Sequence, residues 1–184
     1  ADFSKAIGSD MNFAMGLEWR EETFTTVPGE IAAINGNTSG MSSVKPADAG
    51  AFSRDNVAVY ADLEHDISDD LLMQYAVRYE DFSDFGSTAN GKVAGRYTVS
   101  DSLTIRGSMS TGFHAPTPGQ ANVSTVITTF DGTTGLQVEE GLVRPTSAAA
   151  LAAGGAPLKE EESVNLSLGF TTDLTDSMTL TFDM

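Results

Sequence analysis

Hydrophobic and polar residues alternate along most of this chain with a period of two. The pattern is strongest between Asp55 and Phe113, where four successive runs place apolar residues at every second position. Because successive side chains of a β-strand point to opposite faces of the sheet, such a period is typical of strands. The four runs therefore predict neighbouring strands with one apolar face and one face of charged residues, Ser and Thr.

The same alternation continues on both sides of this region. It predicts a partial strand over residues 1–7 and a longer strand from Met11 to about Thr26. Toward the C-terminus it predicts two more strands, over residues 164–170 and 178–184. We therefore expect an all-β protein, built as an antiparallel up-and-down meander of about seven to eight strands.

The expected connections between these strands differ in length in a regular way. Short turns are predicted at residues 8–10, 68–70, 100–102 and 175–177, a medium loop at 81–91, and long loops at 28–54 and 114–162. In a meander, all short turns then lie at one end of the sheet and the longer loops at the other. Outer-membrane β-barrels have this asymmetry, with short periplasmic turns and long outer loops.

Two further features favour a membrane barrel over a soluble sandwich or lipocalin-like barrel, whose strands also alternate. The strands approach the ~9–11 residues that cross a bilayer at a tilt. Aromatic residues mark the expected strand ends, as interfacial girdles do. They are Trp19, Tyr79 and Phe113 toward the long loops, and Phe13, Tyr97 and Phe170 toward the tight turns. Charged residues would then face a wide lumen, namely Glu18, Arg20, Asp62, Glu64, Arg78, Glu80, Lys92, Arg96 and Arg106.

Composition narrows the possible functions. The formal net charge of -16 argues against a nucleic-acid partner, which requires a basic surface. The chain has no Cys and therefore no disulfide, thiolate metal site or thiol nucleophile. No catalytic, nucleotide-binding or metal-binding motif is present, so we expect no cofactor and no metal. The acidic groups Asp81/Asp84 and Glu160–Glu162 fit either calcium ligands or, as we favour, solvated loop charge.

Three stretches resemble the barrel of TonB-dependent outer-membrane receptors. They run from Arg78 to Lys92, from Ser110 to Gln120 and from Leu158 to Asn165. Family members commonly have Arg at the position of His114 and Pro at the position of Glu160. The resemblance implies a transmembrane barrel of about 22 strands, closed by an N-terminal plug. We expect residues 1–184 to be a partial barrel domain, a fragment without that plug.

The same resemblance implies a function. Such receptors sit in the bacterial outer membrane and actively take up a scarce nutrient of the ferric siderophore, cobalamin or glycan class, with no chemistry of their own. The implied partners are outer-membrane lipid, the nutrient, the receptor's own plug and the TonB complex. One alternative is a soluble β-rich binding or adhesive domain, with apolar residues buried between two sheets. Another is an outer-membrane enzyme, disfavoured because no nucleophile–His pair stands out.

Ligand contacts, if this chain supplies any, are expected from the long loops, because loops on a rigid scaffold usually carry function. The candidates are His114, at a strand–loop junction, and the aromatic residues Phe82, Phe85 and Phe130. An ordinary surface position for His114 and ordinary loop packing for the three Phe residues are the competing interpretations.

Overall fold

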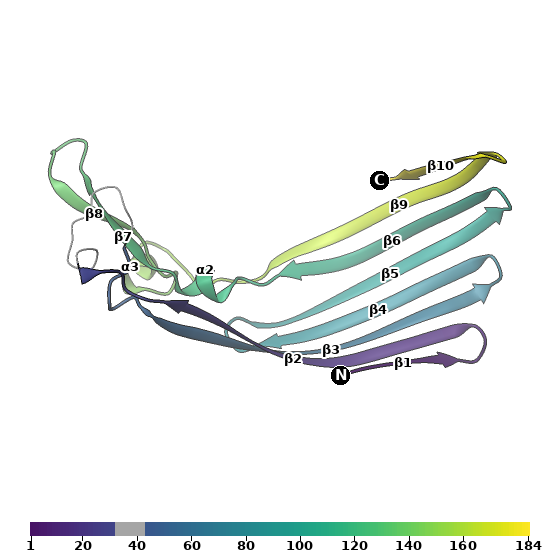
Figure 1. The fold of residues 1–184 in the computed structure, drawn as a ribbon, viewed down its shortest axis with the longest axis horizontal. Coiled ribbons are helices and arrows are strands. Elements are labelled where there is room, and N and C mark those ends of the chain that lie inside the picture. The colour runs from purple at the N-terminus through teal and green to yellow at the C-terminus, as the bar shows by residue number, and fades with distance from the viewer. Residues whose placement is uncertain (32–42) are drawn as a thin grey trace. The chain divides into compact units, whose positions relative to one another are not determined.

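The computed structural model describes residues 1–31 and 43–184 and contains one eight-stranded antiparallel sheet (Figure 1). Its strands are β1 (Asp2–Ile7), β2 (Met11–Thr26), β3 (Gly50–Ser68), β4 (Leu71–Phe82), β5 (Gly86–Ser100), β6 (Leu103–His114), β9 (Glu161–Thr175) and β10 (Met178–Asp183). They follow one another across the sheet in chain order, so the predicted meander is confirmed. Only β7 (Thr125–Phe130) and β8 (Gln137–Leu142) stand apart, as a separate two-stranded sheet.

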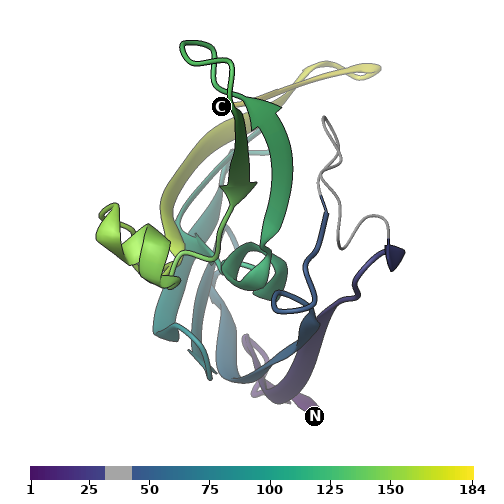
Figure 2. The same ribbon diagram turned by 90° about the vertical axis from the view of Figure 1, so that its left-hand side faces the viewer.

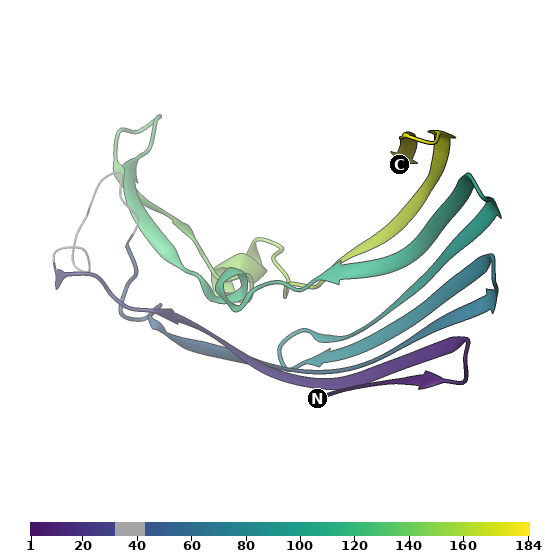
Figure 3. The ribbon, with the colours of Figure 1, turned by 45° about the vertical axis from the view of Figure 1, so that its right-hand side comes forward.

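The register of the strands confirms the predicted faces. Val59 lies opposite Tyr79 and Ala61 opposite Val77, so the apolar positions of β3 and β4 share one face of the sheet. Asp62, on the other parity, lies opposite Ala76, which in turn lies opposite Lys92 of β5. In Figure 3 these strands lie side by side in a single curved layer. The two faces are called here the apolar face and the polar face.

The apolar face is open. Val77 is 62% exposed and Leu166 79% exposed, and the only buried hydrophobic residues among residues 1–31 and 43–184 are Ala58 and Phe82. A soluble β-sandwich would bury this face against a second sheet, because exposed apolar area costs about 25 cal/mol per Å² in water. The open face is what a lipid-facing wall requires and contradicts the burial expected of a soluble sandwich.

The four short turns lie where they were expected. Strands end and resume around residues 8–10, 69–70, 101–102 and 176–177. The medium loop predicted over 81–91 is wrong, because β4 runs to Phe82 and β5 begins at Gly86. Ala89 and Gly91 stand opposite the large Tyr79 and Val77. Because these residues are small, the apolar alternation is not visible in the sequence at the start of β5. Asn90-Gly91, which was predicted to form a turn, lies within this strand.

The long loops are also shorter or more structured than predicted. The loop expected over 28–54 ends where β3 begins at Gly50, and its residues 32–42 lie outside the described part of the chain. The segment 114–162 was expected to be irregular. It instead contains the helix α2 (Pro118–Asn122), the hairpin β7–β8 and the helix α3 (Ala148–Ala152). In the described part of the chain, no helix has the length and apolar character needed to cross a bilayer.

The chain divides into two compact units. The sheet unit comprises residues 1–20, 56–114 and 161–184, and the loop unit comprises residues 21–55 and 115–160. The first and last residues of β3 therefore belong to different units, as do those of β2. The polar face of the sheet unit and the organisation of the loop unit are the two features relevant to function, and each is treated by itself.

Candidate functional site

The loop unit is built on a ribbon formed by the end of β2 and the start of β3. The hydroxyls of Thr23 and Ser53 lie 2.9 Å apart across this ribbon. On the other parity of these strands lie Phe24 and Phe52. Gly119 of α2 packs against the Phe24 ring, so closely that an added Cβ would lie 3.3 Å from it. The segment after β6 therefore packs on the ribbon that ends β2 and starts β3.

Arg54 is the most deeply placed cation of the loop unit. Its side chain is 4% exposed, and its guanidinium donates to the Glu22 carboxylate and to the backbone carbonyl oxygen of Pro116. A buried charge is tolerated only when it is paired and hydrogen-bonded. Arg54 therefore ties the start of the segment 115–160 to the ribbon.

Arg144 makes a second connection of the same kind. Its Nε donates to the carbonyl oxygen of Asn122 over 3.0 Å, and its Nη2 donates to that of Asp48 over 2.8 Å. Its guanidinium also lies 4.7 Å from the centre of the Phe52 ring, within the range of a cation–π contact. One side chain thus joins the last residue of α2 to Asp48, which precedes β3, and to Phe52, which lies within β3.

The β7–β8 hairpin is fixed to the same segment. Ser43 and Val126 exchange two backbone hydrogen bonds of 2.9 and 3.1 Å, and Lys45 pairs with Glu139 over 3.0 Å. The hairpin is the long dark-green ribbon in Figure 2. Contacts from both long connections therefore form one body, which was not foreseen from the sequence.

The short helix α2 is closed by a capping box. The Thr117 hydroxyl accepts from the backbone N–H of Gln120 over 3.1 Å, and the Gln120 side chain accepts from the backbone N–H of Thr117 over 2.7 Å. Pro118 occupies the first turn, where it loses no hydrogen bond. The sequence Thr-Pro-Gly-Gln carries this signal, and a search for capping boxes would have found the helix.

Asp131 organises the turn between β7 and β8. Its Oδ1 accepts from the backbone N–H groups of Thr133 and Thr134, over 3.0 and 2.6 Å, and from the Thr134 hydroxyl over 2.8 Å. These bonds stabilise the charged carboxylate, chiefly those from Thr134, and they lower the pKa of Asp131 below its usual value of 3.8. The β-branched residues at positions 125–129, followed by the turn pair Asp131-Gly132, are the sequence signal for this hairpin.

On the polar face of the sheet unit, charged side chains from different strands are paired. Arg78 of β4 donates to Glu80 and, over 2.9 Å, to Glu18 of β2, reaching across β3. Glu80 also accepts from the buried amide of Asn56 over 3.1 Å. The network confirms that Arg78 and the two Glu residues, predicted to face a lumen, share one face.

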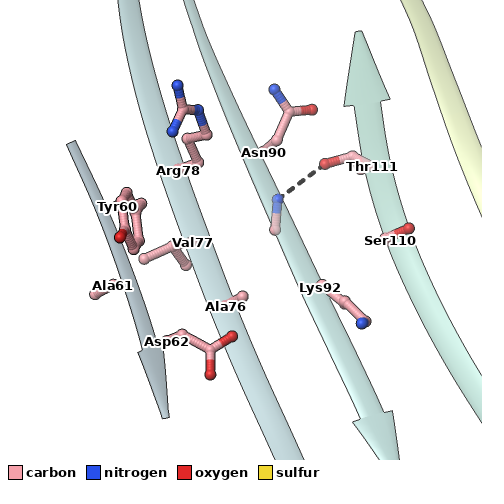
Figure 4. A pocket seen from close by; sticks show the side chains of 11 residues that line it. Tyr60, Ala61, Asp62, Ala76, Val77, Arg78, Asn90, Lys92, Ser110 and Thr111 are labelled. Carbon is pink, nitrogen blue, oxygen red and sulfur yellow. Dashed lines mark hydrogen bonds between the residues drawn. The ribbon is translucent and has the colours of Figure 1, made fainter. Parts of the chain in front are cut away.

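Beside this network lies a shallow hollow over Ala76. Arg78, Asp62 and Lys92 stand around it (Figure 4). On the β6 side of the hollow, the ladder of hydrogen bonds between β5 and β6 stops at Lys92 and Ser110. The pairing of β4 with β5 continues beyond this point to Gly86. The N–H of Gly91 there donates to the Thr111 hydroxyl over 3.0 Å, the dashed line in Figure 4. Charged side chains of both signs thus line the hollow.

Two of the four predicted contact residues lie together. The Phe82 and Phe85 rings stack with centroids 4.5 Å apart, and Phe113 meets Phe82 edge-on at 5.8 Å. Phe82 is only 4% exposed, which favours loop packing for this residue. Exposed His114 ends β6, with Nδ1 3.8 Å from the Glu161 carboxylate. Phe130, which ends β7, is 61% exposed. Ligand contact by any of the four stays a prediction.

Within residues 1–31 and 43–184, no group of three or more His, Asp or Glu side chains is arranged to hold a metal ion. The acidic residues Glu160–Glu162 and Asp81/Asp84, for which calcium binding was the less favoured interpretation, therefore form no such group in the structure.

Comparisons with known proteins agree with this architecture. The family model described as TonB dependent receptor-like, beta-barrel matches residues 1–183. Curated proteins give no match. Among solved structures, the siderophore receptor PirA from Acinetobacter baumannii superposes with a TM-score of 0.68 at 17% identity, covering 99% of this chain and 25% of that one.

The ferric enterobactin receptor PfeA from Pseudomonas aeruginosa gives similar values. One of its mutants superposes with a TM-score of 0.70 at 15% identity, covering 99% of this chain and 25% of that one. Another, in complex with enterobactin, gives 0.69 at 15% identity and covers 100% of this chain and 25% of that chain. This chain thus spans about a quarter of the length of these receptors. The fold, the alternating faces and the family match together show that the chain belongs to the TonB-dependent receptor β-barrel family.

Proposed function

We propose that this chain forms part of the wall, and some of the recognition loops, of an outer-membrane receptor that takes up a ferric siderophore. The proposal rests on the contrast between the two faces of the sheet unit. One is apolar and open, and the other is lined with paired charges. Only a sheet between lipid and a wet interior satisfies both at once.

This proposal fixes an orientation. The apolar face contacts outer-membrane lipid, and the polar face looks into the lumen. The short turns at residues 8–10, 68–70, 100–102 and 175–177 lie in the periplasm, and the loop unit lies outside the cell. The ladders satisfy the backbone groups of the strands, between β5 and β6 as far as Lys92 and Ser110, and they leave unpaired edges at β1 and β10. The rest of the barrel would cover those edges.

The proposed receptor performs no chemistry. It binds its ligand through outer loops. The candidate contacts of the sheet unit are His114 and Phe85, which stacks on the buried Phe82, and the candidate contact of the loop unit is the exposed Phe130. Its plug would sit against the polar face, where paired charges and the hollow over Ala76 offer polar contacts. The TonB complex would supply the energy for transport.

Uptake by the whole receptor tests this proposal. In cells that depend on the receptor for iron, the segment from Thr125 to Leu142 is replaced by a short Gly-Ser linker, and binding and transport of iron-loaded siderophores are measured. We expect transport to need TonB and to fall when the hairpin is removed, with the receptor still present in the outer membrane. Transport unaffected by TonB, or recovery of the protein as a water-soluble species, would contradict the proposal.

A further inference from the structure

Positive and negative residues are segregated on the polar face of the sheet unit. Three successive rows run across β3, β4 and β5, and each has a carboxylate on β3 and an uncharged residue on β4. The rows are Asp62 with Ala76 and Lys92, Glu64 with Gln74 and Ala94, and Asp66 with Leu72 and Arg96. Arg106 of β6 lies directly opposite Arg96. We call the three carboxylates of β3 the acidic stripe, and Lys92, Arg96 and Arg106 the basic stripe.

The two stripes do not neutralise each other. The uncharged residues of β4 lie between them, and two inter-strand spacings separate the backbones of β3 and β5 by roughly 9–10 Å. Arg106 pairs instead with Asp183 of β10 over 2.6 Å. The side chains of Lys92 and Arg96 form no ion pair or hydrogen bond with any residue in the ranges 1–31 and 43–184. Two cations of the basic stripe are therefore available to a partner.

Arg96 has the least favourable position of these cations. It lies directly opposite Arg106, and like charges opposite each other on one face of a sheet are destabilising. The ion pair with β10 compensates Arg106, but no carboxylate in the described part of the chain forms an ion pair with Arg96. Beside Arg96 is a hollow over Ala94, which Glu64, Arg106 and Ser108 also line. The hollow leaves room for a carboxylate that would compensate the charge of Arg96.

A folded segment of the same receptor chain is the occupant that fits both stripes. A mobile ligand with one sign of charge would be attracted to one stripe and repelled by the other. A polypeptide can present carboxylates and cations at fixed positions, and its weak contacts become effective when it belongs to the same chain, because its local concentration is high. Residues 1–184 cover about a quarter of the matched receptors, so a receptor of that length has most of its chain outside the matched region.

We propose that the two stripes fix the orientation of the plug inside the lumen. Carboxylates of the plug bind Lys92 and Arg96, and its cations face the acidic stripe. The plug surface against this wall is then acidic next to β5 and basic next to β3. This inference rests on the proposed function, in which the polar face surrounds the plug, and it adds the sign of charge that each side of the plug surface must carry.

A zero-length carbodiimide tests this in the whole receptor, because it joins a lysine amine to a carboxylate only where the two are in contact. Lys92 supplies one amine, and Arg96→Lys supplies a second while keeping the charge. We expect amide bonds from both positions to Asp or Glu residues outside residues 1–184, located by mass spectrometry of the digested receptor. Asp62→Lys is the matched control, since it places an amine in the row of Lys92 but on the acidic stripe, and it should form no such bond.

Removing both cations gives an independent measurement. In the variant that combines Lys92→Gln with Arg96→Gln, the plug should be held less firmly. Protease added to the receptor in detergent should then cut outside residues 1–184 faster, by up to about fivefold for each lost exposed ion pair. The combination of Lys5→Gln with Lys159→Gln removes the same charge from outside the polar face and should leave the cutting rate unchanged.

The possible outcomes separate this inference from the proposed function. Amide bonds from Lys92 only to carboxylates within residues 1–184 would show that the stripes neutralise each other and would overturn the inference. Equal bonding from position 62, or a cutting rate that ignores the loss of both cations, would overturn it as well. In each of these cases, TonB-dependent uptake of an iron siderophore by the unaltered receptor would leave the proposed function standing. A receptor without such uptake would remove the proposed function, and this inference with it.

Discussion

The guanidinium of Arg54 donates to the backbone carbonyl oxygen of Pro116, so a side chain at the start of β3 holds the backbone of the segment that follows β6. The two residues are 62 positions apart in the chain. Their contact makes two long connections, which the sequence shows only as separate loops, into a single unit.

Replacing Arg54 should loosen the loop unit and leave the sheet intact. In Arg54→Met, the Glu22 carboxylate and the Pro116 carbonyl lose a charged donor, a loss we expect to cost about 1–3 kcal/mol because Glu22 is partly exposed. Limited proteolysis should then cut residues 115–160 faster, with the strands still protected. Arg96→Met, on the exposed polar face, is the matched control and should change nothing. Equal cutting in both variants would refute the role of Arg54.

Position 16 requires a glycine because the aromatic ring of Tyr60 lies against it. Tyr60 lies over Gly16 and donates its hydroxyl to Asp2 over 2.7 Å, so an added Cβ would overlap the ring. We expect Gly16→Ala to destabilise the barrel by about 1–3 kcal/mol, measured by denaturant unfolding in detergent or lipid.

A double-mutant cycle separates this clash from other effects. In a Tyr60→Ala background the cost of Gly16→Ala should fall, because the obstructing ring is gone. The Asp2 carboxylate, whose Oδ1 would lie 2.6 Å from the added Cβ, also loses the Tyr60 hydroxyl that holds it there and can move aside. Gly91→Ala is the control, since its added Cβ would meet the nearest atom at an ordinary 3.7 Å. A cost for Gly16→Ala that does not depend on Tyr60 would show that the glycine is needed for another reason.

The turn of the β7–β8 hairpin should respond to acid in a defined direction. The folded-state pKa of Asp131 lies below its ordinary value of 3.8, so its charge stabilises the turn above that value. This contribution is lost as the pH falls through the lowered pKa. Hydrogen exchange of residues 125–142, corrected for intrinsic rates, should therefore rise at the acid end of a pH series.

Asp131→Asn provides the comparison for this acid response. An Asn side chain can accept the same backbone hydrogen bonds but does not titrate, so its turn should show no such rise. An identical acid response in the two proteins would assign the effect to other carboxylates.

The two faces of the sheet should differ in their tolerance of charge. Val77→Arg places a cation on the open apolar face and should cost about 2–4 kcal/mol near the middle of a bilayer. Ala76→Arg should cost less, because its side chain would enter the hollow beside Asp62 on the polar face. Unfolding of the whole receptor from lipid vesicles measures both costs, and equal values would contradict the assignment of faces.

The sequence predicted the sheet well because its strands carry large apolar residues at every second position. Val57, Val59, Leu63 and Val77 all lie on the apolar face for that reason. Prediction failed at the start of β5, where Ala89 and Gly91 are too small to mark a face, although they pair with Tyr79 and Val77. It also missed β7 and β8, whose hydrophobic positions are few and interrupted by Glu and Thr.

The organisation of the loop unit could not be predicted from the sequence, for a different reason. Its decisive contacts join side chains to backbone carbonyls of distant residues, as in Arg144 with Asp48 and Arg54 with Pro116. No sequence pattern encodes a bond to a carbonyl oxygen, since every residue has one. The charges of these two residues were visible, but the partners that neutralise or hold them were not.

The most direct test of the receptor wall is a scan of β4 with single cysteines, which is practicable because these 184 residues contain no native Cys. Each of residues 74–79 is replaced in turn in the whole receptor, and its thiol is labelled with a fluorophore in lipid vesicles. We predict that labels at Tyr75, Val77 and Tyr79 are quenched by lipid-borne quenchers, and labels at Gln74, Ala76 and Arg78 by water-soluble ones. Labels that respond alike at all six positions would contradict a wall between lipid and a wet lumen.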